Sequence, residues 1–371
     1  METDLLIVGA GPAGMNAAIT ADKAGARVIL VDESFSLGGQ LRQQSQRFTR
    51  LPRNVEKDRG TALGDDLIKQ LEASKVKVLK KHTMIGSYLN ENIGVTDGEK
   101  TFEIQSHKNI IAPGAAEEAK VFPGWTMPGV MTAGAAQILI NRERVLPGKH
   151  AIMIGSDDFS LEVTRQLQAC GVTIKAIVEE KEHILSSNSE RRRDVKDVPV
   201  YLNSLIESVT GKGEVEQVVI RTPDWLQEVD ADLICVSNGF TPIIEPFEIL
   251  NCNLVYHKEL GGWLPEYNAN FQTSNPSCYI AGNAAGITSI GPILLTGEIA
   301  AVGALEELGF IEQKEAEVQK KKLWKQFSEL EREANEKTFQ ARSELMERFY
   351  GKVEMGLPED FSMVKGGLHN G

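Results

Sequence analysis

The sequence predicts an α/β protein in which a strand–helix–strand pattern occurs twice and a helical tail follows. Residues 4–33 contain an apolar strand, a glycine turn, an amphipathic helix and a second apolar strand. Residues 150–180 repeat this order, and after residue 311 the composition shifts to Glu, Lys, Gln and Arg. Strands that alternate with helices in this way are typical of parallel sheets covered by helices. We therefore expect two Rossmann-like domains and a C-terminal helical extension.

The glycine turn of the first pattern has the G-x-G-x-x-G spacing of dinucleotide-binding sites. Gly9 allows the tight turn, Gly11 lets a pyrophosphate approach the backbone, and Gly14 lets the helix pack closely on the strand. The helix that begins around Pro12 and Ala13 offers unpaired N–H groups and a positive dipole end to phosphates. Alone, such a turn is also common as a purely structural feature.

An acidic residue completes the first pattern. Asp32 lies 18 residues beyond Gly14, at the end of the second strand. Its carboxylate can accept hydrogen bonds there from both hydroxyls of an adenosine ribose. Glu33 follows it directly. Because strand, helix, strand and acid all occur at the expected spacing, the sequence favours a dinucleotide site over a bare turn.

Three further segments carry a resemblance to a known family. Gly38-Gly39-Gln40-Leu41 follows the second strand, and residues 279–283 form a short strand that ends in Gly282 and Asn283. Gly291-Pro292 then opens a long apolar helix. The chain resembles the thioredoxin-reductase-like flavoproteins with two dinucleotide-binding domains, in which these segments hold FAD. The resemblance covers roughly residues 4–310 and implies three-layer ββα domains.

The linker narrows this resemblance to one subfamily. Residues 121–137, VFPGWTMPGVMTAGAAQ, resemble the linker of the FAD-bearing alpha subunits of opine oxidases, hydrogen cyanide synthase and dye-linked L-proline dehydrogenases. The glycine motif and the family resemblance together assign FAD contacts to Gly9, Gly11, Pro12, Ala13, Gly14, Asp32, Glu33, Gly39, Gln40, Leu41, Met84, Ala112, Gly114, Gly282, Asn283, Pro292 and Ile293.

The resemblance also implies individual roles. Gly39 and Gln40 are expected along the isoalloxazine ring, although a surface turn is the alternative there. A strand near Met84 would pass the adenine, and the helix that starts around Pro292 would direct its positive end at the flavin. Two residues depart from the family pattern. Pro113 stands where the family has a threonine, and Asn283 stands where it commonly has Asp or Glu.

The second strand–helix–strand pattern has a degenerate fingerprint. Residues 155–160 read GSDDFS, so Asp157 replaces the second glycine and Asp158 adds another acid at the helix start. Acids there can cap a helix, but a carboxylate beside a pyrophosphate costs about 1–4 kcal/mol per close charge pair. We therefore expect that ordinary NAD(P)H binding has been lost. Arg191-Arg192-Arg193 could recognise a 2′-phosphate, or could form a solvated basic turn.

The predicted domain boundaries follow from these patterns. Residues 1–115 and 241–311 would form a discontinuous FAD-binding domain, residues 116–240 the linker and an NAD(P)-binding-like domain, and residues 312–371 a helical extension. In the extension, residues 323, 327, 330, 334, 341 and 345 form one apolar stripe at helical spacing. Either one helix lies over its own domains, or the stripe is a docking or dimer seam. Our hypothesis is that residues 312–350 mediate assembly and contribute little to holding FAD.

Composition excludes several classes of function. With 40 basic and 52 acidic residues, the formal charge is −12, which argues against binding to nucleic acid or anionic lipid. We expect no membrane span and a cytoplasmic location. The four cysteines, Cys170, Cys235, Cys252 and Cys278, include no C-x-x-C pair. We therefore expect neither a redox dithiol nor an iron–sulfur cluster, and the histidine spacing predicts no metal site.

Three functional hypotheses remain open at this stage. The first, implied by the resemblance, is an FAD-dependent oxidoreductase subunit of a homo- or hetero-oligomer. It would act on a small amine or amino-acid substrate, or on a partner dehydrogenase subunit. The second is a self-contained NAD(P)H-dependent flavin reductase. The third is a non-catalytic FAD-binding scaffold. No side chain stands out as a general base, so the catalytic residues are not assigned.

Overall fold

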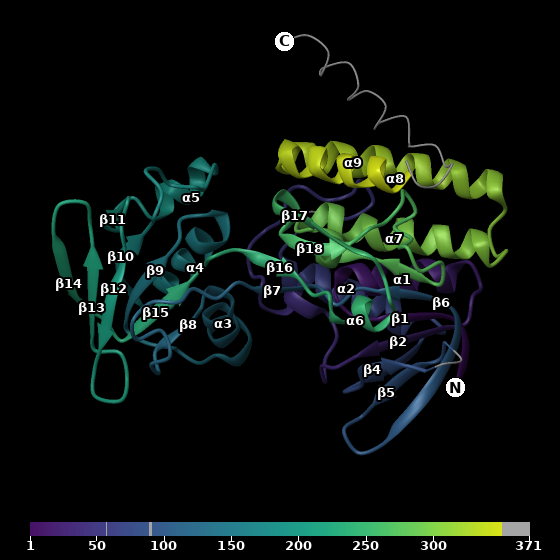
Figure 1. The fold of residues 1–371 in the computed structure, drawn as a ribbon, viewed down its shortest axis with the longest axis horizontal. Coiled ribbons are helices and arrows are strands. Elements are labelled where there is room, and N and C mark those ends of the chain that lie inside the picture. The colour runs from purple at the N-terminus through teal and green to yellow at the C-terminus, as the bar shows by residue number, and fades with distance from the viewer. Residues whose placement is uncertain (57, 89–90, 351–371) are drawn as a thin grey trace, which may run out of the picture. The chain divides into compact units, whose positions relative to one another are not determined.

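The computed structural model describes residues 1–56, 58–88 and 91–350, and these form two compact units (Figure 1). Of the described residues, the first unit contains Met1–Arg42, Arg47–Ala116 and residues 241–350, whereas the second contains Gln43–Gln46 and Glu117–Phe240. Two short strands, β7 (Ala115–Glu117) and β16 (Phe240–Pro242), carry the chain between the units and pair with each other. The last 21 residues of the predicted extension, 351–371, lie outside the described residues.

The first unit is built on a mixed sheet, in which strand β6 pairs in parallel with one neighbour and antiparallel with another. Its parallel part has the order β3-β2-β1-β6, with β19 on the far side of β6, and β4 and β5 add an antiparallel hairpin. The strands are β1 (Glu2–Val8), β2 (Val28–Asp32), β3 (Lys77–Lys80), β4 (Thr83–Ser87), β5 (Ile93–Thr96), β6 (Thr101–Ile111) and β19 (Cys278–Ile280). The start of β6 pairs with β5 and its end with β1. The predicted ββα arrangement is confirmed.

Helices complete this unit. They are α1 (Pro12–Lys23), α2 (Gly60–Glu72), α6 (Glu245–Ile249), α7 (Ile290–Glu307), α8 (Gln313–Ala334) and α9 (Glu336–Tyr350), with a hairpin of β17 (Leu254–His257) and β18 (Gly262–Pro265). Small residues let α1 approach its neighbours closely. A Cβ at Gly14 would stand 1.8 Å from the Gly9 carbonyl oxygen, and one at Gly297 would stand 2.1 Å from the Ala13 carbonyl oxygen. At Gly14 and Gly297 there is therefore no room for a side chain.

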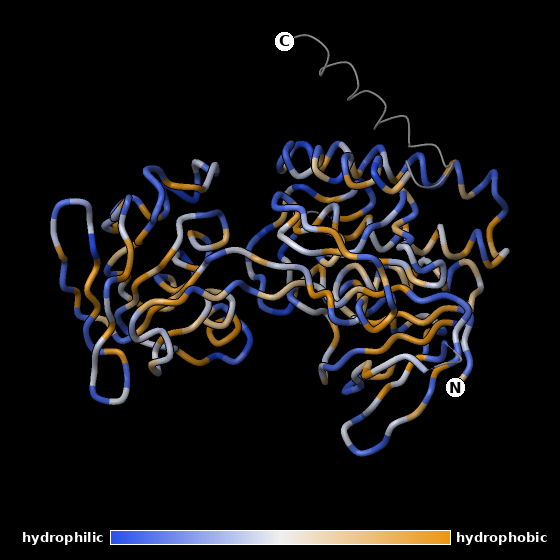
Figure 2. The backbone as a smooth tube through the Cα atoms, viewed as in Figure 1, coloured by the Kyte–Doolittle hydropathy of each residue, from blue (hydrophilic) through white to orange (hydrophobic). Residues whose placement is uncertain are grey.

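The tail consists of two helices, so the prediction of one helix is wrong. Asn335 separates α8 from α9 because its backbone is extended, with φ −162° and ψ 105°. The predicted apolar stripe covers the chain's own core: Leu323, Phe327 and Leu345 are buried in the same cluster as strand β1. Figure 2 shows the central strands mainly orange and the tail helices mainly blue with orange patches. Of the two alternatives for this stripe, the structure shows the helix pair laid over its own unit.

The second unit repeats the nucleotide fold with a five-stranded parallel sheet of order β11-β10-β9-β15-β8. Its elements are β8 (Val130–Thr132), α3 (Ala133–Ile138), β9 (His150–Ile154), α4 (Asp158–Ala169), β10 (Thr173–Val178), α5 (Ser189–Asp194), β11 (Val200–Tyr201) and β15 (Leu233–Val236). A three-stranded antiparallel sheet consists of β12 (Leu205–Thr210), β13 (Gln217–Arg221) and β14 (Leu226–Asp230). A hairpin through residues 211–216 joins β12 to β13. Strand order reverses between β9 and β15, which is where such folds bind ligands.

Candidate cofactor site

The first glycine turn combines one crowded position with one open position. Gly9 has φ +99°, and a Cβ there would stand 2.2 Å from the Ala112 carbonyl oxygen. Gly11 is the N-cap of α1, and no described atom lies within 4 Å of where its Cβ would stand. Within the described chain, no side chain caps this helix end. The turn is therefore locked by Gly9, while Gly11 faces space that a phosphate can use.

Asp32 has the position and hydrogen-bonding capacity expected of a ribose ligand. Its Oδ2 accepts a hydrogen bond from the Ala10 N–H at 2.6 Å, and its Oδ1 accepts one from the Ser34 N–H at 2.8 Å. A carboxylate has about four acceptor sites, so each oxygen can still accept one hydroxyl. These two backbone bonds fix the carboxylate beside the glycine turn, at the carboxyl end of β2.

The segment after β2 lies against the same turn. Gly38 donates its N–H to the Ala10 carbonyl at 3.0 Å, and a Cβ at Gly39 would stand 2.9 Å from the Gly11 Cα. Gln40 is exposed, whereas the side chain of Leu41 is fully buried in the core. Leu41 therefore anchors the segment through its side chain and can offer a ligand its backbone only.

The segment after β19, which contains Gly282 and Asn283, also lies against α1. Gly282 has φ +74°, and a Cβ there would stand 3.2 Å from the Ala13 Cβ. Its N–H donates to Thr296 Oγ1 at 2.8 Å, and Asn283 Oδ1 accepts from the Thr288 N–H at 3.1 Å. Among the described residues, no side chain caps the N-terminus of α7 at Ser289. A second positive helix end is therefore free of an internal carboxylate.

The structure brings most of the predicted FAD residues together around the start of α1. Gly9 lies close to Ala112, Gly39 to Gly11 and Gly282 to Ala13, since a Cβ on each first-named glycine would stand within 3.2 Å of the second residue. The other predicted residues are placed by their elements: Glu33 directly after β2, Met84 in β4, Gly114 before β7, and Pro292 and Ile293 in the first turn of α7. Sequence reasoning missed Thr296, which holds Gly282. Its position four residues after Pro292, on the same helix face, is the signal that could have found it.

The corresponding turn of the second unit is satisfied by its own side chains. Asp157 is the N-cap of α4, and its Oδ1 accepts from the Ser160 N–H at 2.7 Å. The Ser237 hydroxyl lies 3.3 Å from both carboxylate oxygens. Gly155 keeps the tight turn, with φ +99° and its Cβ position 2.3 Å from the Ser237 carbonyl oxygen. The prediction that an acid caps this helix is confirmed.

The acid that would hold a ribose in the second unit is also engaged. Glu179 follows β10 and is 5% exposed. It accepts hydrogen bonds from the Ser156 hydroxyl at 2.6 Å and the Lys181 N–H at 2.9 Å. The Ser156 hydroxyl in turn accepts the Leu185 N–H at 2.9 Å. The carboxylate therefore ties the chain after β10 to the glycine turn, where a ribose would otherwise bind.

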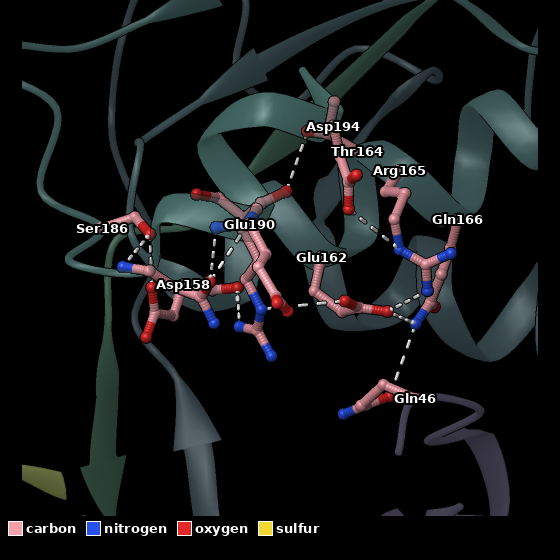
Figure 3. Close-up of polar contacts among 12 residues, drawn as sticks. Gln46, Asp158, Glu162, Thr164, Arg165, Gln166, Ser186, Glu190 and Asp194 are labelled. Carbon is pink, nitrogen blue, oxygen red and sulfur yellow. Dashed lines mark hydrogen bonds and ion pairs between the residues drawn. The ribbon is translucent and has the colours of Figure 1, made fainter. Parts of the chain in front are cut away.

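The predicted basic turn is a short helix, α5, and its arginines are bonded to the chain itself. Arg191 donates to the Asp158 carbonyl, and Arg192 Nε donates to the Ser186 carbonyl at 2.6 Å. The Ser186 hydroxyl also bonds the Asp158 carboxylate. Figure 3 shows this cluster and, beside it, Glu162, which Arg165 and Gln166 approach to 2.5 and 2.7 Å. Asp158, Ser186, Arg191 and Arg192 thus form a connected polar network at the start of α4.

A further carboxylate satisfies the start of α3. Glu117 accepts from the Thr132 hydroxyl at 2.6 Å and from the Gly134 N–H at 2.8 Å. A Cβ at Gly134 would stand 2.3 Å from Glu117 Oε2, so a side chain there would displace the carboxylate from the helix start. Burial raises the pKa of Glu117, and the nearby charge of Asp157 raises it further. Sequence reasoning did not single out Glu117 because it lies in the linker, remote in sequence from α3.

Comparisons with known proteins decide the family. The model of the pyridine nucleotide-disulphide oxidoreductases matches residues 3–303. The chain belongs to this family. The family implies an FAD-type cofactor, and the prediction of an FAD-dependent oxidoreductase is confirmed. The open glycine turn, Asp32 and the uncapped starts of α1 and α7 fit such a cofactor.

The predicted subfamily resemblance is confirmed by individual relatives. The chain is 27% identical to an opine oxidase subunit from Agrobacterium tumefaciens, covering 83% of this chain and 66% of that one. It is 28% identical to hydrogen cyanide synthase subunit HcnB of Pseudomonas protegens, covering 85% and 73%. The fold matches L-proline dehydrogenase from P. horikoshii with a TM-score of 0.70 and 22% identity, covering 88% and 59%. The chain thus spans less than two thirds of the opine oxidase subunit.

Two kinds of feature are absent from the described ranges. No helix in them is long and apolar enough to cross a membrane. Nor do three or more His, Cys, Asp or Glu side chains in residues 1–56, 58–88 and 91–350 gather as a metal-ligand set. The predicted cytoplasmic location and the absence of an iron–sulfur cluster stay predictions.

Proposed function

We propose that the chain is the FAD-binding subunit of an amine or amino-acid dehydrogenase or oxidase complex, and that NAD(P)H is not its electron donor. One observation carries this proposal. The phosphate-binding helix end is open in the first unit, at Gly11, and is capped by the chain's own Asp157 in the second. The first unit can therefore hold FAD, whereas the capped turn of the second unit does not suit the phosphates of a nicotinamide nucleotide. Electrons must then come from another reductant.

The chain's residues have defined tasks in this proposal. Bound FAD would supply the hydride-accepting chemistry. Gly11 leaves room for the pyrophosphate, Asp32 orients the adenosine ribose, and the first turn of α7 directs N–H groups toward developing negative charge on the flavin. The catalytic residues stay unassigned, which is consistent with a substrate site completed by another subunit.

The relatives support the substrate class. Opine oxidase, hydrogen cyanide synthase and L-proline dehydrogenase are all named for small nitrogen compounds that they act on or produce. The matched opine oxidase and hydrogen cyanide synthase chains are each named as a subunit. We therefore assign this chain a small amine or amino-acid substrate and a hetero-oligomeric assembly. The alternative of a self-contained NAD(P)H reductase is disfavoured because Asp157, Glu179 and Arg192 are all engaged internally.

The test is reduction of the flavin in the native assembly. The tagged chain is isolated from its source with whatever co-purifies, and is mixed anaerobically with opines, L-proline and other N-substituted amino acids. At least one of these should bleach the flavin of the assembly, whereas the isolated, FAD-loaded chain should react much more slowly. If no amine reduces the flavin of either preparation, the protein is an FAD-binding scaffold and the proposal fails.

A further inference from the structure

The second tail helix places a charged side chain in the interior of the first unit. Arg342 in α9 is fully buried, as is Glu331 in α8. The two form a bidentate pair, with Nε to Oε2 at 2.9 Å and Nη2 to Oε1 at 2.9 Å. A buried charge is tolerated only when it is paired and its remaining donors are satisfied. The remaining donors of this guanidinium therefore indicate what the pair is there to hold.

Those donors reach the turn that is expected to hold FAD. Arg342 Nη1 donates to the Ala285 carbonyl at 2.5 Å and to the Tyr267 hydroxyl at 2.5 Å, and Nη2 lies 3.5 Å from the Gly286 carbonyl. The Tyr267 hydroxyl also donates to the Ala285 carbonyl, at 2.7 Å. Burial raises the pKa of Tyr267 to about 12, so this hydroxyl keeps its proton. Two donors from outside the turn thus hold one carbonyl in place.

The contacted carbonyls end a short 3₁₀ segment, Gly282–Ala285, whose opposite end packs on α1. Gly282 approaches Ala13 there, at the start of the phosphate-binding helix. At the Arg342 end, Gly286 has φ +113°, and a Cβ would stand 3.0 Å from Leu260 and 3.4 Å from Arg342 Nη2. The turn is therefore clamped between α1 on one side and the tail on the other, with little freedom to shift.

A separate contact anchors the tail without touching this turn. Trp324 in α8 stacks on Phe271, with ring centroids 5.4 Å apart and an interplanar angle of 14°. Its Nε1 donates to the Ala269 carbonyl at 2.9 Å. Phe327 lies beneath the Arg342 guanidinium, 5.3 Å from its ring centroid. Because Trp324 fastens the tail through α8 and directs its indole N–H at Ala269 rather than at residues 282–286, it provides a matched control for Arg342.

We propose that Arg342 is a positioning residue that sets the backbone of residues 282–286 for FAD, so that the tail is part of the cofactor site. This inference rests on the proposed FAD site. It replaces the hypothesis that the tail contributes little to holding FAD. A tail that only covered the core would need apolar residues there, whereas Arg342 directs its hydrogen bonds at the carbonyls of one turn.

The experiment compares full-length variants prepared without flavin. Arg342→Met combined with Glu331→Gln removes both charges and avoids leaving a carboxylate buried alone. Tyr267→Phe removes a single hydroxyl from the same carbonyl, and Trp324→Phe is the control. For each we measure the Kd for FAD by quenching of flavin fluorescence, the melting temperature of the flavin-free protein, and the visible circular dichroism of the bound flavin.

The Kd should rise about tenfold or more in the double variant and about threefold in Tyr267→Phe, since each loses a hydrogen bond at the turn. In Trp324→Phe the Kd for FAD should stay within about twofold of that of the unmodified chain, although the melting temperature falls. A changed flavin dichroism is expected only where the turn is released. If the double variant fails to fold, Tyr267→Phe decides.

Three results overturn the proposal, and they are distinguishable. If the turn variants bind FAD as tightly as the unmodified chain, Arg342 only stabilises the fold and the FAD proposal stands. If Trp324→Phe weakens FAD binding as much as the turn variants do, the effect is general destabilisation. If the unmodified chain itself binds no FAD, this inference and the proposed function both fail.

Discussion

Helices α1 and α4 begin with nearly the same backbone and end up with opposite properties. Gly9 and Gly155 both have φ +99°, and a Cβ on either would collide with a backbone carbonyl oxygen, 2.2 Å away at Ala112 and 2.3 Å away at Ser237. The two turns differ at the second glycine position of the motif. Gly11 occupies this position before α1, and Asp157 occupies it before α4. The comparison teaches that the first glycine maintains the fold of the turn, whereas the second decides whether the turn can accept a phosphate.

The same contrast extends to the groups around each turn. Asp32 is held by two backbone N–H groups and is half-buried, whereas Glu179 is buried and bonded to Ser156. In the second unit, the starts of α3, α4 and α5 all carry a side-chain cap. Among the described residues, α1 and α7 of the first unit have none, and neither do α2, α6 and α8 of that unit. The contrast that bears on the cofactor is therefore between α4, which starts with its own carboxylate cap, and α1 and α7, whose starts carry none.

Replacing Gly11 by leucine should give the largest effect. Its backbone, with φ −73°, suits any residue, and the described chain leaves the Cβ position open. The protein should therefore fold, but the side chain would fill the pyrophosphate path. We expect a loss of about 3 kcal/mol in FAD affinity, roughly a hundredfold in Kd. The measurement is the FAD content of the purified variant together with the melting temperature of its flavin-free form.

Two other glycine variants sharpen this test. Gly86→Leu, on β4, also points into open space within the described part of the chain and should retain FAD. Gly14→Ala should lower the melting temperature itself, because its Cβ would stand 1.8 Å from the Gly9 carbonyl oxygen. A Gly11→Leu protein that purifies with full FAD content would show that the pyrophosphate binds elsewhere.

Removing the cap of α4 should have a moderate effect confined to stability. Asp157→Ala deletes the acceptor for the Ser160 N–H, and loss of such a cap costs about 0.5–2 kcal/mol. Asp157→Asn keeps an acceptor and should cost much less. Urea unfolding measures both, with FAD content as the control. A drop in FAD content without a loss of stability would mean that Asp157 serves the flavin rather than its own helix.

The sequence predicted the first site well because its signals are local. Gly9, Gly11, Gly14 and Asp32 act through backbone geometry within one strand–helix–strand unit, so their spacing alone carries the prediction. The comparison proteins confirmed the family, and the fold matches the predicted two nucleotide folds. The caps of the second unit were partly predictable for the same reason, since Asp157 acts within its own helix.

The tail could not be predicted in this way. An apolar stripe from Leu323 to Leu345 is compatible with one helix or two, and only the extended backbone of Asn335 divides it. The burial of Arg342 depends on Tyr267 and Ala285, which are 75 and 57 residues away in the chain. No periodicity reveals a long-range pair of this kind. Glu117 is a similar case, because its partners belong to a helix that starts 16 residues later.

The smallest expected effect concerns Glu117 and pH. Because its pKa is raised in the folded state, the folded protein binds its proton more tightly than the unfolded chain does. The free energy of unfolding should therefore fall as pH rises above about 4.5, the ordinary value for this group. Glu117→Gln should flatten this decline and change stability at neutral pH by less than about 1 kcal/mol. Urea unfolding of both proteins between pH 4.5 and pH 7 measures it; an unchanged slope would contradict the assignment.

Anaerobic mixing of the FAD-loaded protein with NADH and with NADPH tests the contrast between the two units most directly. The measured quantity is the rate at which the flavin absorbance is lost, with dithionite as the control that the flavin can be reduced. With Asp157 on the helix end and Glu179 bonded to Ser156, neither nucleotide should reduce the flavin faster than it does free FAD. Rapid bleaching that saturates with nucleotide concentration would show that the second unit binds a dinucleotide after all.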